Sequence, residues 1–177
     1  MRREQRSRLA LSAAAFLFVV SATGVDARQA EKKQTLPPPT TSATKHTMVT
    51  PDQVKFGPAP PGLPAGGQMA VIDGDPGKPA LFTARLKMPD GYKIPPHWHP
   101  TDEHVTVLSG TLKAGSGAQW DDASMHPLPA GSYANMRRKQ NHYVTAQGET
   151  VVQITAMGPF EITYVNAQDD PRKKSSN

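Results

Sequence analysis

Short apolar or alternating segments, each closed by glycine or proline, are the feature that most narrows the possible folds of this chain. No window keeps the 3.6-residue apolar period of an amphipathic helix. Strands separated by turns at this interval predict an all-β antiparallel sandwich or barrel, and a jelly roll is one way to protect the sheet edges. The segments are QMAVID (68–73), LFTARLKM (81–88), HVTVLSG (104–110), TLKAG, SYANM, HYVTA, TVVQITAM (150–157) and FEITYV (160–165).

The distribution of polar residues and proline predicts one folded domain with appendages. A chain of 177 residues is long enough for one sizeable core and too short for two ordinary domains. We expect the packed region to run over 52–169, preceded by a flexible polar spacer (28–51) and followed by a polar tail (170–177). Dense proline in PAPPGLPAGG (58–67) suits an extended arm or loop.

The first 27 residues read as a secretory signal peptide. A basic start precedes the apolar run LALSAAAFLFVV (9–20), and small residues follow up to Ala27. We expect cleavage after Ala27, with Ala22 as the second choice. A membrane anchor is the alternative, but twelve residues fall short of the ~20 needed to span a bilayer. The pattern therefore predicts a bacterial periplasmic or secreted protein with no stable membrane anchor after cleavage.

Charge and cysteine content exclude several partners and chemistries. Loss of the leader removes four Arg and two acidic residues, which lowers the formal charge from +5 to +3. The remaining cations are scattered apart from short runs at 137–139 and 172–174, so nucleic acid is not an expected partner. The chain has no cysteine, which excludes disulfides, thiolate ligands and cysteine catalysis. Any metal must therefore be held by imidazole and carboxylate groups.

The stretch GYKIPPHWHPTDEHVTVLSG (91–110) carries the strongest chemical signal. On a strand, His97 and His99 point to the same side and Trp98 to the other. If Glu103 opens the next strand, its carboxylate points inward and His104 points outward. Two imidazoles and a carboxylate suit Fe, Mn, Ni, Cu or Zn better than Ca, which prefers oxygen ligands.

These residues follow the pattern Gly, five residues, His-x-His, three residues, Glu, six residues, Gly without a gap. This is the first cupin motif, and the chain resembles the cupin superfamily. The resemblance implies a jelly-roll β-barrel over 52–169 and frequent dimerisation, which makes a homodimer an expected partner. It also implies one divalent metal ion held by three histidines and one glutamate.

The second cupin motif is degenerate. Its usual form is Pro-x-Gly, two residues, His, three residues, Asn, and aligning its histidine with His142 puts Arg137, Lys139 and Ala146 at the Pro, Gly and Asn positions. The segments LPAGSY (128–133) and 148–166 are similar to small bacterial cupins with a ligand histidine at this position. The resemblance therefore implies metal ligation by His97, His99, Glu103 and His142. A lysine at the glycine position predicts a local conformational cost.

Several other polar residues could have either a functional or a structural role. Tyr133, Asn135 and Arg137 alternate along one strand face and could line the pocket, although ordinary packing is at least as good an account. Gln153 could reach into the barrel and bond a ligand. The cationic run 137–139 could attract an anionic substrate or be a solvated hairpin loop.

Three further histidines are not expected to bind metal. His46 lies in the spacer and His126 lies beside a turn, and neither has a partner at ligand spacing. For His104 we favour a surface or interface role over that of a catalytic base, because strand alternation directs it away from the metal.

Two functional hypotheses remain open. The first is a metal-dependent enzyme acting on a small organic molecule as an oxygenase, isomerase or lyase, because four protein ligands leave positions open on a first-row ion. The second is a non-catalytic module that binds a metal or small ligand, for example as a sensor. A second titratable group facing the open positions would favour chemistry, and a purely apolar wall would favour binding.

Overall fold

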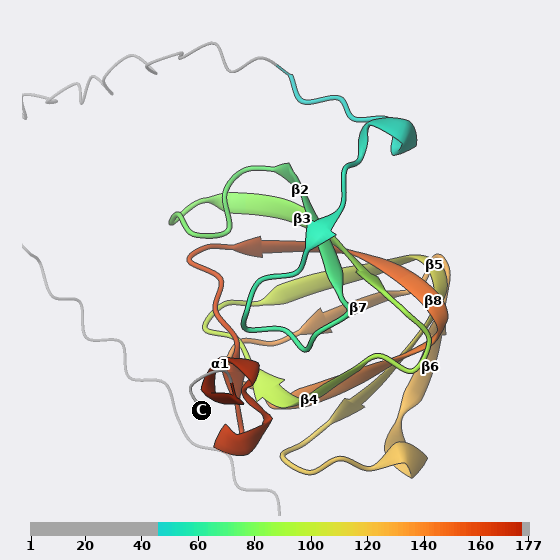
Figure 1. Cartoon of the computed structure of the whole chain (residues 1–177), viewed down its shortest axis with the longest axis vertical. Helices are drawn as coiled ribbons and strands as arrows, with labels where there is room; N and C mark the ends of the chain where they lie inside the picture. Colours follow the sequence, from blue (N-terminus) through green and yellow to red (C-terminus); the bar gives the residue numbers. More distant parts are fainter. Residues whose placement is uncertain (1–45, 175–177) are drawn as a thin grey trace, which may run out of the picture. The chain divides into compact units, whose positions relative to one another are not determined.

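The computed structural model describes residues 46–174, so the predicted leader and most of the predicted spacer lie outside the described residues. The described chain forms a curled, mostly antiparallel sheet (Figure 1). Its strands are β1 (Gly57–Pro58), β2 (Gln68–Asp73), β3 (Leu81–Met88), β4 (Lys93–Trp98), β5 (Glu103–Ser116), β6 (His126–Pro129), β7 (Tyr133–Met136), β8 (His142–Met157) and β9 (Thr163–Tyr164). The helical turns are η1 (Pro51–Gln53), η2 (Asp122–Ser124), η3 (Ala167–Asp169) and α1 (Pro171–Lys174).

The strand order confirms the predicted all-β jelly-roll barrel. One path of neighbouring strands runs β1-β2-β3-β8-β4-β9, while β5 pairs with β8, β6 and β7. Every pairing is antiparallel. None of the helices in the part of the chain that the structure describes is long and apolar enough to cross a bilayer.

Two long strands replace four of the short segments that we expected. The segments 104–110 and TLKAG join in β5, and HYVTA and 150–157 join in β8. Gly110 and Gly148 have φ angles of 72° and 70°, which glycine adopts at little steric cost. The β5–β8 register shifts around Gly110, so these glycines bend the strands without ending the pairing.

The core follows from strand alternation. In β3, every second residue from Phe82 to Met88 is buried, and the residues between them are only partly buried. The same alternation buries Val105 and Val107 in β5 and Val152 and Ile154 in β8. Each such side chain contributes roughly 1.5–3 kcal/mol relative to an exposed position. These apolar residues form one cluster that leads up to the end of β4 and the starts of β5 and β8.

The segment FEITYV differs from its expected structure. Only Thr163 and Tyr164 pair as strand β9, and they pair with the end of β4. Phe160 instead packs against Phe82 and the ring of His99, with ring centroids 5.3 and 4.4 Å apart. Tertiary packing on the histidine cluster therefore takes these residues out of the sheet.

Candidate metal centre

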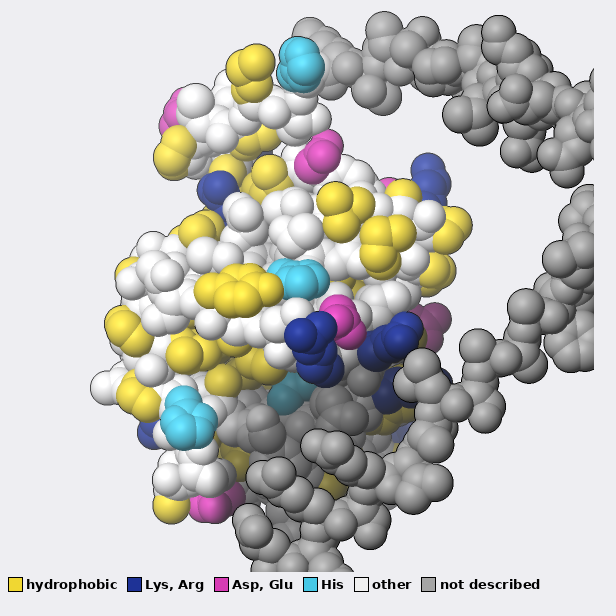
Figure 2. Space-filling view, turned by 180° about the vertical axis from the view of Figure 1, so that it is seen from behind, with side chains coloured by type: hydrophobic (Ala, Val, Ile, Leu, Met, Phe, Trp, Pro, Cys, Tyr) yellow, Lys and Arg dark blue, Asp and Glu magenta, His cyan; other side chains and the backbone are white. Residues whose placement is uncertain are grey.

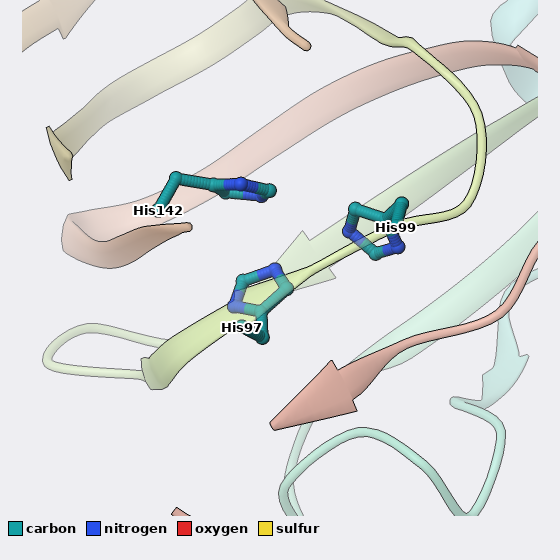
Figure 3. A group of neighbouring side chains, drawn as sticks. All are labelled: His97, His99 and His142. Carbon is teal, nitrogen blue, oxygen red and sulfur yellow. The ribbon is translucent and has the colours of Figure 1, made fainter. Parts of the chain in front are cut away.

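Three histidines meet where β4 ends and β8 begins. His97 lies in β4 directly opposite His142, the first residue of β8, and their ring centroids are 4.2 Å apart. His99 follows β4, and its ring centroid lies 5.0 Å from that of His97 and 5.3 Å from that of His142. Figure 3 shows the three rings turned toward one another. Each ring offers a nitrogen within 4.8 Å of the others, and all three side chains are buried, so the cluster could hold a metal ion.

Backbone carbonyls set the orientation of all three rings. The Nδ1 atoms of His97, His99 and His142 lie 2.7, 2.6 and 3.1 Å from the carbonyl oxygens of Pro95, Glu161 and Gln140. A carbonyl oxygen only accepts hydrogen bonds, so each Nδ1 carries the hydrogen and donates it. In its neutral form each ring then has its lone pair on Nε2, which is how a metal-ligating histidine is oriented by a backbone carbonyl.

Glu103 lies beside the cluster as the first residue of β5. Its Oε2 is 3.6 Å from Nε2 of His99 and 3.5 Å from Nε2 of His142. The Glu103 side chain is buried. His104 is only partly buried, and its Nδ1 shares a hydrogen bond of 2.6 Å with the hydroxyl of Tyr133. Strand alternation thus places Glu103 inward and His104 outward, as predicted.

The protonation states suit a cation. Burial, followed by the charges of His142 and His99, lowers the pKa of His97 to about 3. Burial also lowers the pKa of His99. Burial raises the pKa of Glu103, but the neighbouring imidazoles outweigh this effect and hold it below its usual value. At neutral pH the cluster therefore combines an ionised carboxylate with uncharged His97 and His99.

Two observations test whether a metal fits. Nε2 of His142 is buried and has no hydrogen-bond partner, because it carries a lone pair and the nearby carboxylate oxygen of Glu103, 3.5 Å away, also only accepts. In the described part of the chain, the ion-pair partners of Glu103 are histidines, with no Lys or Arg among them. A buried carboxylate without a cation and a buried lone pair without a donor are both unfavourable. A divalent metal ion would satisfy both, so the residues fit a metal.

A small apolar chamber lies on one side of the cluster. It has a volume of about 100 Å³ and is bordered by His97, His99 and Glu103. Its other lining residues, among them Leu63, Ile94, Ile154, Phe160 and Ile162, carry only apolar side chains. One wall is the segment 60–64, which we call the strap. The strap is tied down by Tyr92 and Tyr164, whose hydroxyls donate to the carbonyls of Pro64 and Gly62 at 2.5 and 2.8 Å.

A polar cleft lies on the other side, next to His142. Its volume is about 360 Å³, and its lining includes Ser116, Asn135, Arg137 and Gln140. Arg137 pairs with Asp102 at 2.9 Å rather than extending as a free cation. On the face shown in Figure 2, basic side chains lie beside acidic ones instead of forming a broad basic patch.

Only some of the other polar residues predicted to line the pocket do so. Asn135 and Arg137 border the cleft, but Tyr133 is exposed and bonded to His104. The suggestion that Gln153 reaches into the barrel is wrong, because its Oε1 accepts from Nε of Arg85 at 3.2 Å. Gln153 lies opposite Arg85 in the register, and its neighbour Ile154 is the residue that borders the chamber.

The lysine in the degenerate second motif does carry the expected conformational cost. Lys139 has a φ angle of 58° and is the one non-glycine residue with positive φ in the range 46–174. Its backbone N–H donates to the carbonyl of His99 at 2.8 Å. The loop therefore links the segments that carry two of the histidines, although its motif glycine is missing.

Several residues around the cluster could not be predicted from their sequence pattern. Phe160 stacks on His99 with an interplanar angle of 14°, and Glu161 holds that ring through its carbonyl. Their alternation resembled a strand, so only tertiary structure reveals this role. Arg172, from the region expected to be a polar tail, pairs with Asp170 and donates to the carbonyl of Ile162 at 3.1 Å.

Solved structures support the fold. The polyketide cyclase RemF from Streptomyces resistomycificus aligns with a TM-score of 0.59 at 16% identity, over 75% of this chain and 94% of that one. A putative acetylacetone dioxygenase from Methylibium petroleiphilum PM1 aligns with a TM-score of 0.57 at 20% identity, over 73% and 88%. The DMSP lyase DddQ from Ruegeria pomeroyi DSS-3 aligns with a TM-score of 0.50 at 15% identity, over 63% and 60%. At these identities the alignments show a shared fold only.

Sequence comparison identifies the family. No curated protein matches the chain. A model of the ChrR cupin-like domain matches residues 44–161, which include the whole histidine cluster and Glu103. Together with the barrel and its structural neighbours, this match shows that the chain belongs to the ChrR cupin-like family of the cupin superfamily.

Proposed function

We propose that this protein binds one divalent transition metal ion through His97, His99, Glu103 and His142, and uses it to act on a small organic molecule. The observation that carries the proposal is the common orientation of the rings: three Nδ1 atoms are bonded to backbone carbonyls, so three Nε2 atoms are directed into one buried site. Imidazole and carboxylate donors suit Fe, Mn, Ni, Cu or Zn.

The chemistry is proposed to be of the oxygenase, isomerase or lyase type. When bound, a first-row ion with open positions can polarise a carbonyl, activate water or bind dioxygen. The protein's own residues hold and orient the ligands, and the apolar chamber keeps bulk water away from one side. Structural neighbours named as a polyketide cyclase, a putative dioxygenase and a lyase are compatible with this range of reactions.

The apolar wall favours a second candidate, a non-catalytic module that binds a metal or small ligand. Apart from His97, His99 and Glu103, the chamber lining has no acid or base to transfer a proton. An enzyme of this kind must therefore rely on the ion, on those residues, or on groups in the polar cleft. Turnover by the metal-loaded protein distinguishes the two candidates.

Elemental analysis tests metal binding. The wild type is purified without added chelator beside His97→Ala and His142→Ala, with His104→Ala and His126→Ala as controls outside the cluster. We expect about one transition metal per chain in the wild type and both controls, and loss of it in the two cluster variants. A wild type that stays metal-free even after reconstitution would contradict the proposal.

A turnover assay separates the enzyme from the binding module. The protein is loaded in turn with Fe, Mn, Ni, Cu and Zn and incubated with a panel of small carbonyl compounds. Oxygen consumption and product mass are followed, with the metal-free His142→Ala variant as control. Product formation that needs both metal and His142 supports the enzyme, whereas tight ligand binding without turnover supports the binding module.

Export is a separate proposal that rests on residues 1–27. Their basic start and apolar run favour secretion, and cleavage after Ala27 is the expected processing. Mass spectrometry of the protein from a bacterial host, with fractionation of the cells, tests it. An intact N-terminus in the cytoplasmic fraction would contradict export.

A further inference from the structure

The chamber offers a ligand almost nothing to hydrogen-bond with. Its polar lining comes from His97, His99 and Glu103, which lie together at one end. The rest is hydrocarbon, with Leu63, Met69, Leu86, Ile154, Phe160 and Ile162 among the lining residues. A polar group of a ligand placed among them would lose its hydrogen bonds to water without replacement. The chamber therefore excludes polar groups except where they reach the ion.

The volume limits the ligand's size. The chamber holds about 100 Å³, whereas an apolar cavity of about 150 Å³ accommodates benzene. The available space therefore suits about four carbon atoms. A short aliphatic group fills it, whereas an aromatic ring or a long chain must either move a wall or extend out of the chamber.

The strap forms one wall of the chamber. It is fastened at two points, because Tyr92 bonds the carbonyl of Pro64 and Tyr164 bonds the carbonyl of Gly62. A Cβ on Gly62 would lie 3.0 Å from Ile162, so the strap and Ile162 are already close together. Pro60 and Leu63 are the strap's apolar side chains that border the chamber, and Leu63 is the one to alter because proline also constrains the backbone.

We propose that the chamber is the pocket for the apolar part of the ligand. The ligand class is a small molecule with metal-binding oxygen at one end and an unbranched chain of about four carbons, the carbon at that end included. This inference rests on the proposed function, since the metal ion binds the oxygen. The hydrocarbon walls then select among chelators by the length and polarity of their tails.

The test uses hydroxamic acids, which chelate divalent metals through two oxygens. The full chain is loaded with Co²⁺, whose visible spectrum reports ligand binding without any turnover. Acetohydroxamate, butanohydroxamate, hexanohydroxamate and octanohydroxamate are titrated, together with 4-hydroxybutanohydroxamate. We expect affinity to rise about 10-fold from the two-carbon to the four-carbon acid and to fall for the longer ones. The hydroxylated acid should bind at least about 10-fold more weakly than butanohydroxamate.

Variants identify the wall responsible. Leu63→Ala should shift the preference toward hexanohydroxamate, and Ile162→Val should do so to a smaller extent while keeping the fold. Leu108→Ala is the matched control, because Leu108 is an exposed leucine in β5 outside the chamber. Its preference should equal that of the wild type.

Failure of this inference is distinct from failure of metal binding. If Co²⁺ binds at about one per chain but all the hydroxamates bind equally, the chamber is not the tail pocket and the metal proposal stands. If Co²⁺ does not bind, the proposed function itself is wrong, and the ligand class is wrong with it. A Leu63→Ala profile identical to the wild type would overturn the role of the strap.

Discussion

The two sides of the histidine cluster differ sharply in character. The chamber side is small and apolar, and one of its walls is a strap that two buried tyrosines hold by hydrogen bonds. The cleft side is more than three times larger and polar, and its arginine is already paired with an aspartate. The cluster thus borders an apolar chamber through His97, His99 and Glu103, and a polar cleft through His142. Under the proposed function, the chamber is the side that selects ligands, and the cleft is the side that offers polar groups.

The largest effect is expected from Glu103→Gln, which removes the negative charge of the carboxylate that lines the chamber. The amide keeps the shape of the side chain but is a poor metal ligand, and loss of a supporting partner alone lowers metal affinity by about 10–100-fold. Loss of a ligand should therefore lower it by at least about 100-fold. The metal-free protein should become more stable, because a buried carboxylate without a cation is removed.

Competition with a chelator measures the affinity, and urea unfolding measures the stability. Glu161→Gln is the matched control, because the Glu161 side chain is exposed and its backbone carbonyl still accepts from His99. Unchanged affinity in Glu103→Gln would remove the carboxylate from the ligand set and reduce the site to three histidines.

The next effect is the acid sensitivity of the metal-free protein. Burial and the neighbouring histidines lower the pKa of His97 to about 3, so between pH 6.5 and 3 the unfolded chain binds a proton that the folded chain does not. Stability is therefore present above pH 6.5 and is lost as the pH falls. Each such histidine contributes a slope of about 1.4 kcal/mol per pH unit.

Urea unfolding between pH 5 and 7 measures this slope. The range lies above the titration of the carboxylates, so the buried imidazoles dominate it. His97→Gln should reduce the slope by about 1.4 kcal/mol per pH unit near pH 5, which is the contribution of one proton, and by less near pH 7. Equal slopes in the wild type and the variant would mean that His97 is protonated in the folded state.

A smaller effect tests whether ligands leave the site past the strap or through the cleft. Tyr164→Phe removes the hydrogen bond to the carbonyl of Gly62 and should destabilise the protein by about 1 kcal/mol. It should also speed dissociation of butanohydroxamate by loosening the strap. The comparison is Arg137→Ala, which breaks an exposed ion pair in the cleft and should change stability by less than about 0.5 kcal/mol. If Arg137→Ala speeds dissociation more, ligands pass through the cleft instead.

The smallest effect concerns the cleft-side loop. Lys139→Gly should raise stability by about 0.5–1 kcal/mol, because glycine adopts a φ of 58° without the Cβ strain. Lys139→Ala keeps the Cβ and loses the charge, so it should leave stability nearly unchanged. Thermal unfolding of both variants measures the difference. A gain in Lys139→Ala as large as that in Lys139→Gly would assign the cost to charge instead of backbone.

Strand alternation accounts for what could be predicted of the site. It places His97 and His99 on one side and sends Glu103 and His104 in opposite directions, because side-chain direction along a strand depends only on parity. The prediction for Gln153, which did not rest on alternation, was wrong. Parity alone does not say which side of β8 is inward, and that side is set by the register with β3 and β5.

The rest depends on tertiary contacts that leave little trace in sequence. Gly110 reads as a turn, yet the paired strands β5 and β8 continue past it. The pattern around Phe160 predicts a strand, but in the structure its ring stacks on the ring of His99. The proline-rich stretch 58–67 reads only as an arm or loop, and nothing in it reveals that the chamber wall is tied to Tyr92 and Tyr164.

The backbone support behind the three imidazoles bears on how such a site survives mutational drift. The acceptors are main-chain oxygens of Pro95, Gln140 and Glu161, and every residue type supplies the same oxygen. The side chains at these three positions can therefore change without loss of the hydrogen bonds that orient the rings, as long as the barrel still folds. This explains how a chain can lose the proline, glycine and asparagine of a motif and still keep its histidine in place.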